Sequence, residues 1–224
     1  MKVKQISAVI FDMDGLMFDS ERVGRAAWRQ AGEEFGYNIG DEHYQQVSGR
    51  TVADATEVFR GIFGEDFPFQ EIRRRRVQIA RDYFEQHGVP IKPGLLELLD
   101  YLDARALPRA VATSTDYAPA MEKLTRTALA KRMHAIVTGD QVARGKPAPD
   151  IFFAAAKQLN ADPPRCLVLE DSEAGIRAAH SAGMIPVMVL DLKQPSEEVR
   201  RLAVLVAASL DEVREWMEGL QIEG

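Results

Sequence analysis

The fold of this chain is decided by the stretch Val9-Ile10-Phe11-Asp12-Met13-Asp14-Gly15. It reads as the end of a buried strand over residues 6–11 that stops at two acids and a glycine. Two carboxylates two residues apart at a strand end project toward one side of the chain. They repel each other unless a cation lies between them. The alternative is an Asp-rich turn, because Asp and Gly are ordinary turn residues.

Three further motifs favour a functional site over a simple turn. Two of them also end apolar runs, and the third is a loop that contains a lysine. They are Arg109-Ala110-Val111-Ala112-Thr113-Ser114-Thr115, Gly145-Lys146-Pro147-Ala148-Pro149-Asp150 and Cys166-Leu167-Val168-Leu169-Glu170-Asp171-Ser172. In an open parallel sheet the carboxyl ends of the strands line one crevice, where ligands bind. Carboxylates for a hard cation, with a lysine and a hydroxyl for phosphate oxygens, indicate phosphoryl chemistry.

Strand-like and helical patterns alternate along most of the chain. Strands are predicted over residues 6–11, 109–113, 135–138, 166–169, 186–190 and 203–207, and helices over 94–104, 118–128, 149–159, 173–182, 197–201 and 210–220. This alternation predicts an α/β fold, a Rossmann-like parallel sheet with helices on both faces.

Residues 18–88 break the alternation, because they read as helices over 21–36, 42–47, 52–63 and 69–86. This segment is too long for a normal crossover. We therefore predict a small all-helical cap domain, residues 18–88, inserted into a core made of residues 1–17 and 89–224, with hinges at 18–20 and 88–90. Such a cap can close over the crevice and exclude water. The apolar stripe of the last cap helix is expected to contain Ile72, Val77, Ile79, Ala80 and Phe84. The arginines Arg73–Arg76 are therefore expected on its solvated side, and the alternative is a phosphate-attracting patch.

Composition limits the class of protein. The 224 residues, 46% hydrophobic and 28% charged, are typical of a soluble globular chain with one α/β domain and a small insertion. No apolar run approaches the roughly 20 residues that span a bilayer. The early first strand predicts no signal peptide. The single cysteine, Cys166, lies in a predicted strand, which excludes a disulfide within the chain and favours the cytoplasm.

The net charge of −6 argues against a nucleic-acid partner. It does not exclude an anionic substrate, because a bound cation and a lysine reverse the local field. The four histidines, at positions 43, 87, 134 and 180, show no metal-ligand spacing and are predicted to be structural or surface residues.

Taken together, the DMDG, VATS, GKPAPDIF and LEDSEAGIRAAHSAGM motifs resemble those of the haloacid dehalogenase superfamily, in the branch with β-phosphoglucomutases and small-metabolite phosphatases. The motifs occur in the family's order, and the resemblance spans nearly the whole chain. It implies a Mg²⁺-dependent phosphoric monoester hydrolase that acts on a small phosphorylated metabolite such as a sugar phosphate.

The resemblance implies a role for each acid. Asp12 would be the nucleophile that forms an aspartyl-phosphate. Asp14 would be the general acid and base. Asp12, the Asp14 backbone carbonyl and Asp171 would hold Mg²⁺, and Glu170 would bind the metal directly or through a water. The alternative for Glu170-Asp171 is an N-terminal cap for the helix that begins near Glu173, a role that Asp171 or Ser172 could fill without excluding the metal role.

Lys146 would neutralise Asp12 and the transferred phosphoryl group. Thr113 would bind a phosphoryl oxygen, assisted by the backbone amides of Ser114 and Thr115. The alternatives are a surface lysine and a β-branched strand residue. In the cap, Gly49 and Arg50 are candidate substrate contacts.

A phosphatase is the leading prediction and a β-phosphoglucomutase is the alternative. The mutases that this chain resembles carry a cap histidine at the position of Gly24 and an arginine at the position of Val52, although Arg50 could partly compensate for the missing arginine. A phosphonatase needs a cap lysine, and residues 18–88 contain none. A phospho-receiver module, the alternative of another class, would place its adjacent acid pair early and would lack a cap.

Overall fold

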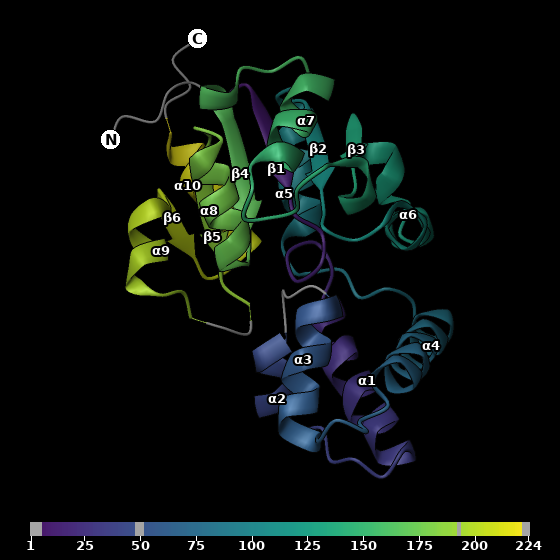
Figure 1. Cartoon of the computed structure of the whole chain (residues 1–224). Coiled ribbons are helices and arrows are strands. Elements are labelled where there is room, and N and C mark those ends of the chain that lie inside the picture. Colours follow the sequence, from purple (N-terminus) through teal and green to yellow (C-terminus); the bar gives the residue numbers. More distant parts are fainter. Residues whose placement is uncertain (1–5, 48–51, 192–193, 221–224) are drawn as a thin grey trace. The chain divides into compact units, whose positions relative to one another are not determined.

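The computed structural model describes residues 6–47, 52–191 and 194–220. The chain forms two compact units, Met1–Phe18 with Ile91–Gly224, and Asp19–Pro90 (Figure 1). The two connecting segments pair with each other: Phe18 forms a β-bridge with Ile91, and the Asp19 N–H donates to the Pro90 carbonyl at 2.9 Å. The two ends of the inserted segment are therefore adjacent in space.

The larger unit contains a six-stranded parallel sheet in the order β3-β2-β1-β4-β5-β6. This confirms the predicted α/β class, and each strand begins and ends within two residues of its predicted bounds. The strands are β1 (Ala8–Phe11), β2 (Arg109–Ala112), β3 (Ala135–Val137), β4 (Cys166–Glu170), β5 (Ile185–Val189) and β6 (Leu205–Ala207).

The strand order reverses between β1 and β4. From β1 the chain builds β2 and β3 on one side, then crosses to build β4, β5 and β6 on the other. Phe11 pairs with Leu169 in the register of β1 and β4, so Asp12 and Glu170 are the next residues on adjacent strands. In open α/β sheets, ligands bind outside the carboxyl ends of the strands at such a switch point.

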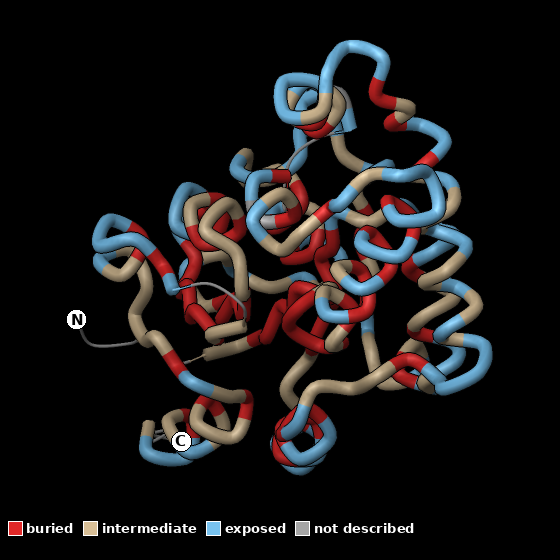
Figure 2. The backbone as a smooth tube through the Cα atoms, turned by 90° about the horizontal axis from the view of Figure 1, so that it is seen from below, coloured by how far each residue is buried: buried red, intermediate tan, exposed pale blue. Residues whose placement is uncertain are grey.

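Every residue of β1, β2, β4 and β5 is buried, so both faces of these strands are covered. Buried stretches of the backbone are red in Figure 2. One face packs mainly small side chains, including Ala8, Ala112 and Cys166, against α7 (Asp150–Gln158) and α8 (Glu173–Ser181). The alternate residues, such as Val9 and Phe11, are equally buried. Continuous burial explains why these strands read as unbroken apolar runs. Burial raises the pKa of the Cys166 thiol to about 11, in keeping with an inert core residue.

The other core helices follow the predicted pattern with small differences at their ends. They are α5 (Leu95–Ala104), α6 (Tyr117–Arg126), α9 (Glu197–Leu202) and α10 (Leu210–Gly219). Helix α6 ends two residues before its predicted end, because Ala128 adopts a left-handed conformation with φ of 59°. Three short 3₁₀ segments were not predicted: Leu129–Arg132, Gly139–Gln141 and Pro163–Arg165.

The inserted unit contains α1 (Ser20–Glu34), α2 (Asp41–Val47), α3 (Val52–Phe63) and α4 (Phe69–His87), close to the four predicted helices. Its core is aromatic. Trp28 stacks on Phe59 with ring centroids 5.1 Å apart, and Phe59 stacks on Phe67 at 5.3 Å. Such contacts let a small unit bury a large apolar area. None of the described helices is both long and apolar enough to cross a membrane.

The arginine run on α4 is only partly as expected. Arg75 forms a two-pronged ion pair with Glu34, whereas the Arg76 guanidinium lies 5.9 Å from the Trp28 ring centroid. Val77, expected in the apolar stripe, is 45% exposed, so that prediction is wrong. Its position explains this, because five residues after the buried Ile72 amount to a turn of about 140° away from the buried side.

Candidate active site

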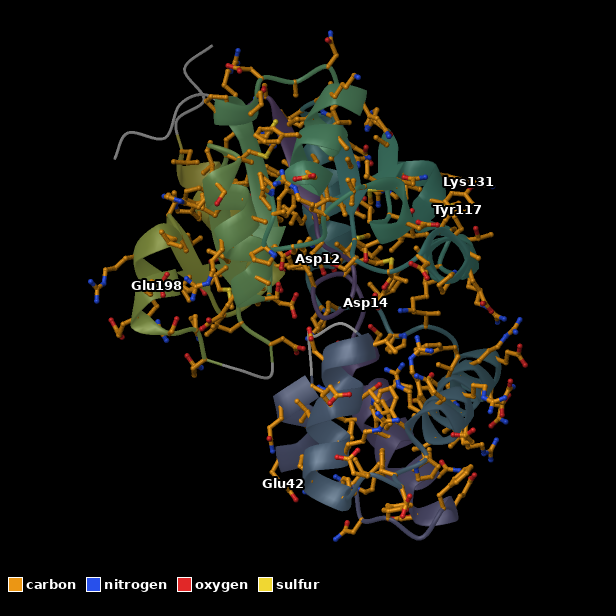
Figure 3. The ribbon with its side chains drawn as sticks, viewed as in Figure 1. Asp12, Asp14, Glu42, Tyr117, Lys131 and Glu198 are labelled. Atoms are coloured by element: carbon orange, nitrogen blue, oxygen red, sulfur yellow. The ribbon has the colours of Figure 1, made fainter. Side chains whose placement is uncertain are left out.

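Asp12 lies directly after β1 and is 7% exposed. Its backbone N–H donates to the Leu169 carbonyl at 2.9 Å, which continues the ladder between β1 and β4 by one residue. Asp14 follows in the same loop (Figure 3). Gly15 has a φ of 91°, and a Cβ at this position would overlap the Asp171 carboxylate. The glycine of the DMDG motif therefore makes room for an acid that lies 156 positions later in the chain.

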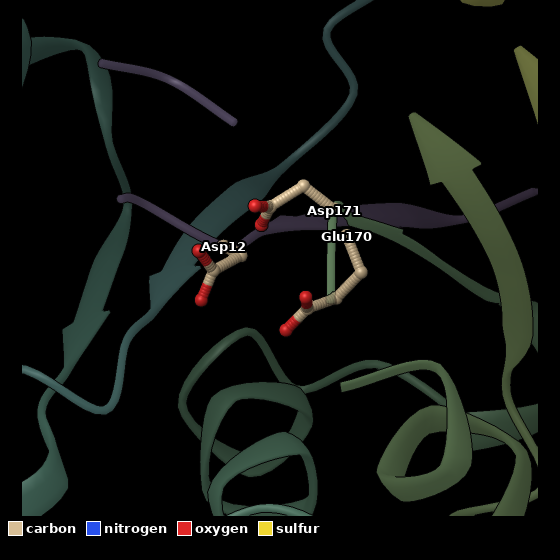
Figure 4. Close-up of side chains that lie close together, drawn as sticks. All are labelled: Asp12, Glu170 and Asp171. Carbon is tan, nitrogen blue, oxygen red and sulfur yellow. The ribbon is translucent and has the colours of Figure 1, made fainter. Parts of the chain in front are cut away.

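Three carboxylates meet at the reversal of strand order, from Asp12, Glu170 and Asp171 (Figure 4). One oxygen of each lies within 4.8 Å of the others. An all-carboxylate set of this kind suits a hard divalent cation, so these residues can hold a metal. The family resemblance implied Asp12 and Asp171 as ligands and Glu170 as a direct or water-mediated one, and the structure brings the three carboxylates together. The predicted contribution of the Asp14 backbone carbonyl stays a prediction.

Lys146 is buried between two of these acids. Its Nζ donates to Asp12 Oδ1 at 2.5 Å, to Glu170 Oε1 at 2.5 Å and to the Ala112 carbonyl at 3.0 Å. These three bonds use all three donors of the ammonium group. The side chain is only 5% exposed, so the alternative of a surface lysine is wrong. The loop reaches this position through a cis Lys146–Pro147 peptide bond.

The charge balance around Asp12 favours binding of a cation. Burial raises the pKa of Asp12 to about 7; Lys146 opposes this increase, and Glu170 and Asp14 add to it. Burial alone would lower the pKa of Lys146, but its two carboxylate partners hold it above its ordinary value. One ammonium therefore faces two buried acids and Asp171, and a proton or a metal ion would compensate the excess negative charge.

Glu170 is fully buried and held from two sides. Besides Lys146, it accepts from the Ser172 N–H at 3.1 Å and from the Ser172 hydroxyl at 2.8 Å. Ser172 is also the N-cap of α8, because its hydroxyl oxygen accepts from the Gly175 N–H at 3.0 Å. The predicted capping role thus belongs to Ser172, and it leaves Glu170 and Asp171 in the cluster.

Thr113 lies at the end of β2 and is 1% exposed. Its hydroxyl oxygen accepts from the Thr115 N–H at 3.1 Å. The Thr115 amide, expected to assist phosphate binding, is therefore already engaged within the loop. The hydroxyl hydrogen of Thr113 and the amide of Ser114 stay candidates for that role.

Two partners of Asp14 were not predicted from the sequence. The Thr115 hydroxyl donates to Asp14 Oδ2 at 2.7 Å, and the Lys123 ammonium forms an ion pair with Asp14 Oδ1. Lys123 lies on α6 within an amphipathic pattern, where nothing in the local sequence marks it as different from a surface lysine.

The structure describes only some of the remaining predicted residues. Gly49 and Arg50 fall outside the residues that the structure describes. The metal-compatible cluster found among the described residues contains no histidine. His43 accepts from the Gly40 N–H and His134 from the Arg109 N–H, which are structural roles.

Known proteins resemble this chain in sequence and in fold. The profile of haloacid dehalogenase-like hydrolases matches residues 6–183. A phosphorylated carbohydrates phosphatase of Thermotoga maritima is 31% identical over 80% of this chain and 82% of its own length. A β-phosphoglucomutase of Bacillus subtilis is 32% identical over 82% of this chain and 83% of its own length. The crystal structure of a hydrolase from Pseudomonas syringae superimposes with a TM-score of 0.77 at 27% identity, covering 95% of this chain and 98% of that one.

Proposed function

Because the chain belongs to the haloacid dehalogenase-like hydrolase family, we propose that it is a Mg²⁺-dependent phosphatase of a small phosphorylated metabolite, such as a sugar phosphate. The observation that carries the proposal is the position of Lys146 between Asp12 and Glu170, beside the three-carboxylate cluster. A buried acid beside a fixed ammonium and a potential metal site is suited to attack on a phosphoryl group.

Asp12 is the proposed nucleophile. A carboxylate oxygen of Asp12 attacks phosphorus as the bond from phosphorus to the ester oxygen breaks, and an aspartyl-phosphate results. Lys146 fixes Asp12 Oδ1, which leaves the other oxygen for the attack. Its ammonium also offsets the charge that accumulates around the transferred group.

Asp14 is the proposed acid and base. It gives a proton to the leaving ester oxygen in the first step and takes one from water in the second. The water oxygen then bonds to phosphorus, and the bond to Asp12 breaks with its electron pair returning to the carboxylate. Thr113 and the Ser114 amide, beside Asp12 at the end of β2, are the proposed contacts for phosphoryl oxygens.

The metal proposal rests on the fit of the acids. Asp12, Glu170 and Asp171 offer oxygens within 4.8 Å of one another and carry more negative charge than Lys146 compensates. Mg²⁺, when bound there, would supply the positive charge that lets an anionic nucleophile approach an anionic phosphoryl group.

The inserted unit Asp19–Pro90 is the proposed cap that selects the substrate. β-Phosphoglucomutase is the second candidate, in view of the Bacillus subtilis relative. One observation favours the phosphatase. A Cβ at Gly24 would lie 2.8 Å from an Arg76 terminal nitrogen, so arginine occupies the space beside the position where the resembled mutases carry a histidine.

The test is release of inorganic phosphate from an aryl phosphate with Mg²⁺, after chelation, and after Mg²⁺ is restored. A panel of sugar phosphates, polyol phosphates, phosphoglycolate and nucleoside monophosphates then ranks substrates. We expect activity that chelation abolishes and Mg²⁺ restores. Full activity after metal removal would disprove the metal assignment, and no phosphate release from any compound would disprove the phosphatase.

A further inference from the structure

Two lysines contact the acids that follow β1, and they differ in how many hydrogen bonds they still have to offer. Lys146 uses all three of its donors on protein oxygens and is 5% exposed. Among the residues that the structure describes, the Lys123 ammonium forms its hydrogen bond and ion pair with Asp14 alone, and its side chain is 17% exposed. An ammonium group has three donors, so Lys123 keeps donors that a bound ligand can use.

The contact of Lys123 is made to the residue that is proposed to protonate the leaving group. Asp14 is held at both oxygens, Oδ2 by the Thr115 hydroxyl and Oδ1 by Lys123, and its side chain is 21% exposed. A carboxylate oxygen that gives a proton to the ester oxygen lies one hydrogen bond from it. When Oδ1 gives the proton, Lys123 Nζ lies at most two hydrogen-bond lengths, about 5 to 6 Å, from that ester oxygen.

We propose that Lys123 binds an oxygen on the substrate carbon next to the phosphoester carbon, and so selects phosphomonoesters with a vicinal hydroxyl or carbonyl group. This proposal rests on the proposed phosphatase function and on Asp14 as its acid and base. A vicinal oxygen bridges the gap between the ester oxygen and Nζ, whereas an alkyl chain would leave the ammonium donors unsatisfied when the site closes.

A neutral oxygen suits Lys123 because the ammonium is already paired with Asp14. A second phosphate or carboxylate on that carbon would compete with Asp14 for the ammonium and disturb the residue that protonates the leaving group. A hydroxyl or carbonyl oxygen accepts one of the remaining hydrogen bonds and leaves that pairing in place.

The experiment compares 2-hydroxyethyl phosphate with ethyl phosphate, which differ only in the vicinal hydroxyl. We expect the wild-type ratio of kcat/KM to favour the hydroxy ester about tenfold or more, the range of a hydrogen bond to a charged group. Lys123→Met should bring the ratio close to one, and Lys123→Arg should retain part of it. Lys157→Met, which removes an exposed lysine of α7, should leave the ratio unchanged.

If Lys123→Met is too slow to assay, the same ratio is measured by calorimetry as dissociation constants in an Asp12→Asn background, with and without Lys123→Met. An unchanged ratio in Lys123→Met, in turnover or in binding, would overturn the proposal. Aryl phosphate hydrolysis by the wild type tests the phosphatase separately, because an aryl phosphate has no vicinal hydroxyl group. Its absence would count against the proposed function rather than against the contact of Lys123.

Discussion

Gly175 leaves the space that the Glu170 carboxylate occupies, because a Cβ at position 175 would overlap that carboxylate. Gly175 lies in the first turn of α8, and its N–H donates to the hydroxyl of the capping Ser172. Glu170 can therefore reach Lys146 only because residue 175 has no side chain.

Gly175→Ala should displace Glu170 and with it Lys146, which that carboxylate helps to fix. We expect kcat/KM for an aryl phosphate to fall about a hundredfold, the scale of a small misplacement in a catalytic site. The matched control is Gly61→Ala on α3, where a Cβ meets nothing within 4 Å. It should stabilise the protein by about 0.5–1 kcal/mol and leave activity unchanged. Wild-type activity in Gly175→Ala would show that the position of Glu170 does not matter.

Asp12→Asn should abolish turnover while the protein stays folded, because amide and carboxyl have the same shape. We expect a loss of at least about a thousandfold, measured by phosphate release. Acid-quenched mass spectrometry should find a phosphoryl adduct on Asp12 in the wild type and none in the variant. Asp100→Asn, on an exposed surface ion pair with Arg132, is the control. More than a tenth of wild-type turnover, a difference under about 1.4 kcal/mol in barrier, would exclude Asp12 as nucleophile.

Stabilisation by Mg²⁺ should increase with pH. The pKa of Asp12 is about 7 in the folded protein and 3.8 in its ordinary state, so the metal-free fold keeps a proton that the unfolded chain releases. The contribution of that proton to stability is complete below pH 3.8 and is lost as pH rises through 7. Because Mg²⁺ must displace the proton, its apparent Kd should fall about tenfold per pH unit up to pH 7 and then level off.

The measurement is the rise in Tm caused by Mg²⁺ at pH 5.5 and at pH 8. The wild type should gain more at pH 8, and Asp12→Asn should show little difference between the two. An equal gain at both pH values in the wild type would mean that the metal does not bind through the Asp12 carboxylate.

The chain should release phosphate from β-glucose 1-phosphate without converting it to glucose 6-phosphate. This should hold even when the corresponding glucose bisphosphate is supplied as activator. A mutase must hold its bisphosphate intermediate through the phosphate that lies far from the nucleophile, which a two-pronged arginine contact does well. The inserted unit, the proposed cap, has Gly24 and Val52 at the positions where the resembled mutases carry histidine and arginine. Efficient conversion with little phosphate release, measured by a coupled dehydrogenase assay, would favour the mutase.

The order and type of the elements were predictable because they depend on local patterns. The apolar runs at β1, β2 and β4 are buried on both faces, and each ends in acids or hydroxyls that belong at the carboxyl end of a strand. Helix ends were less predictable. The end of α6 depends on the left-handed conformation of Ala128, a residue that rarely adopts it.

The sequence by itself indicated that Asp12, Glu170 and Asp171 belong to one site, since parallel strands bring their carboxyl ends to one edge. Lys146 lies in a loop, and the family resemblance of its motif assigned it to the same site. Only the tertiary structure decided which groups touch. Lys123 and Asp14 are 109 positions apart, and Gly175 matters through the side chain of another residue. A helical period shows which side of α6 or α8 is buried, but not which atom of a distant loop meets it. That depends on packing between elements, which local periodicity does not encode.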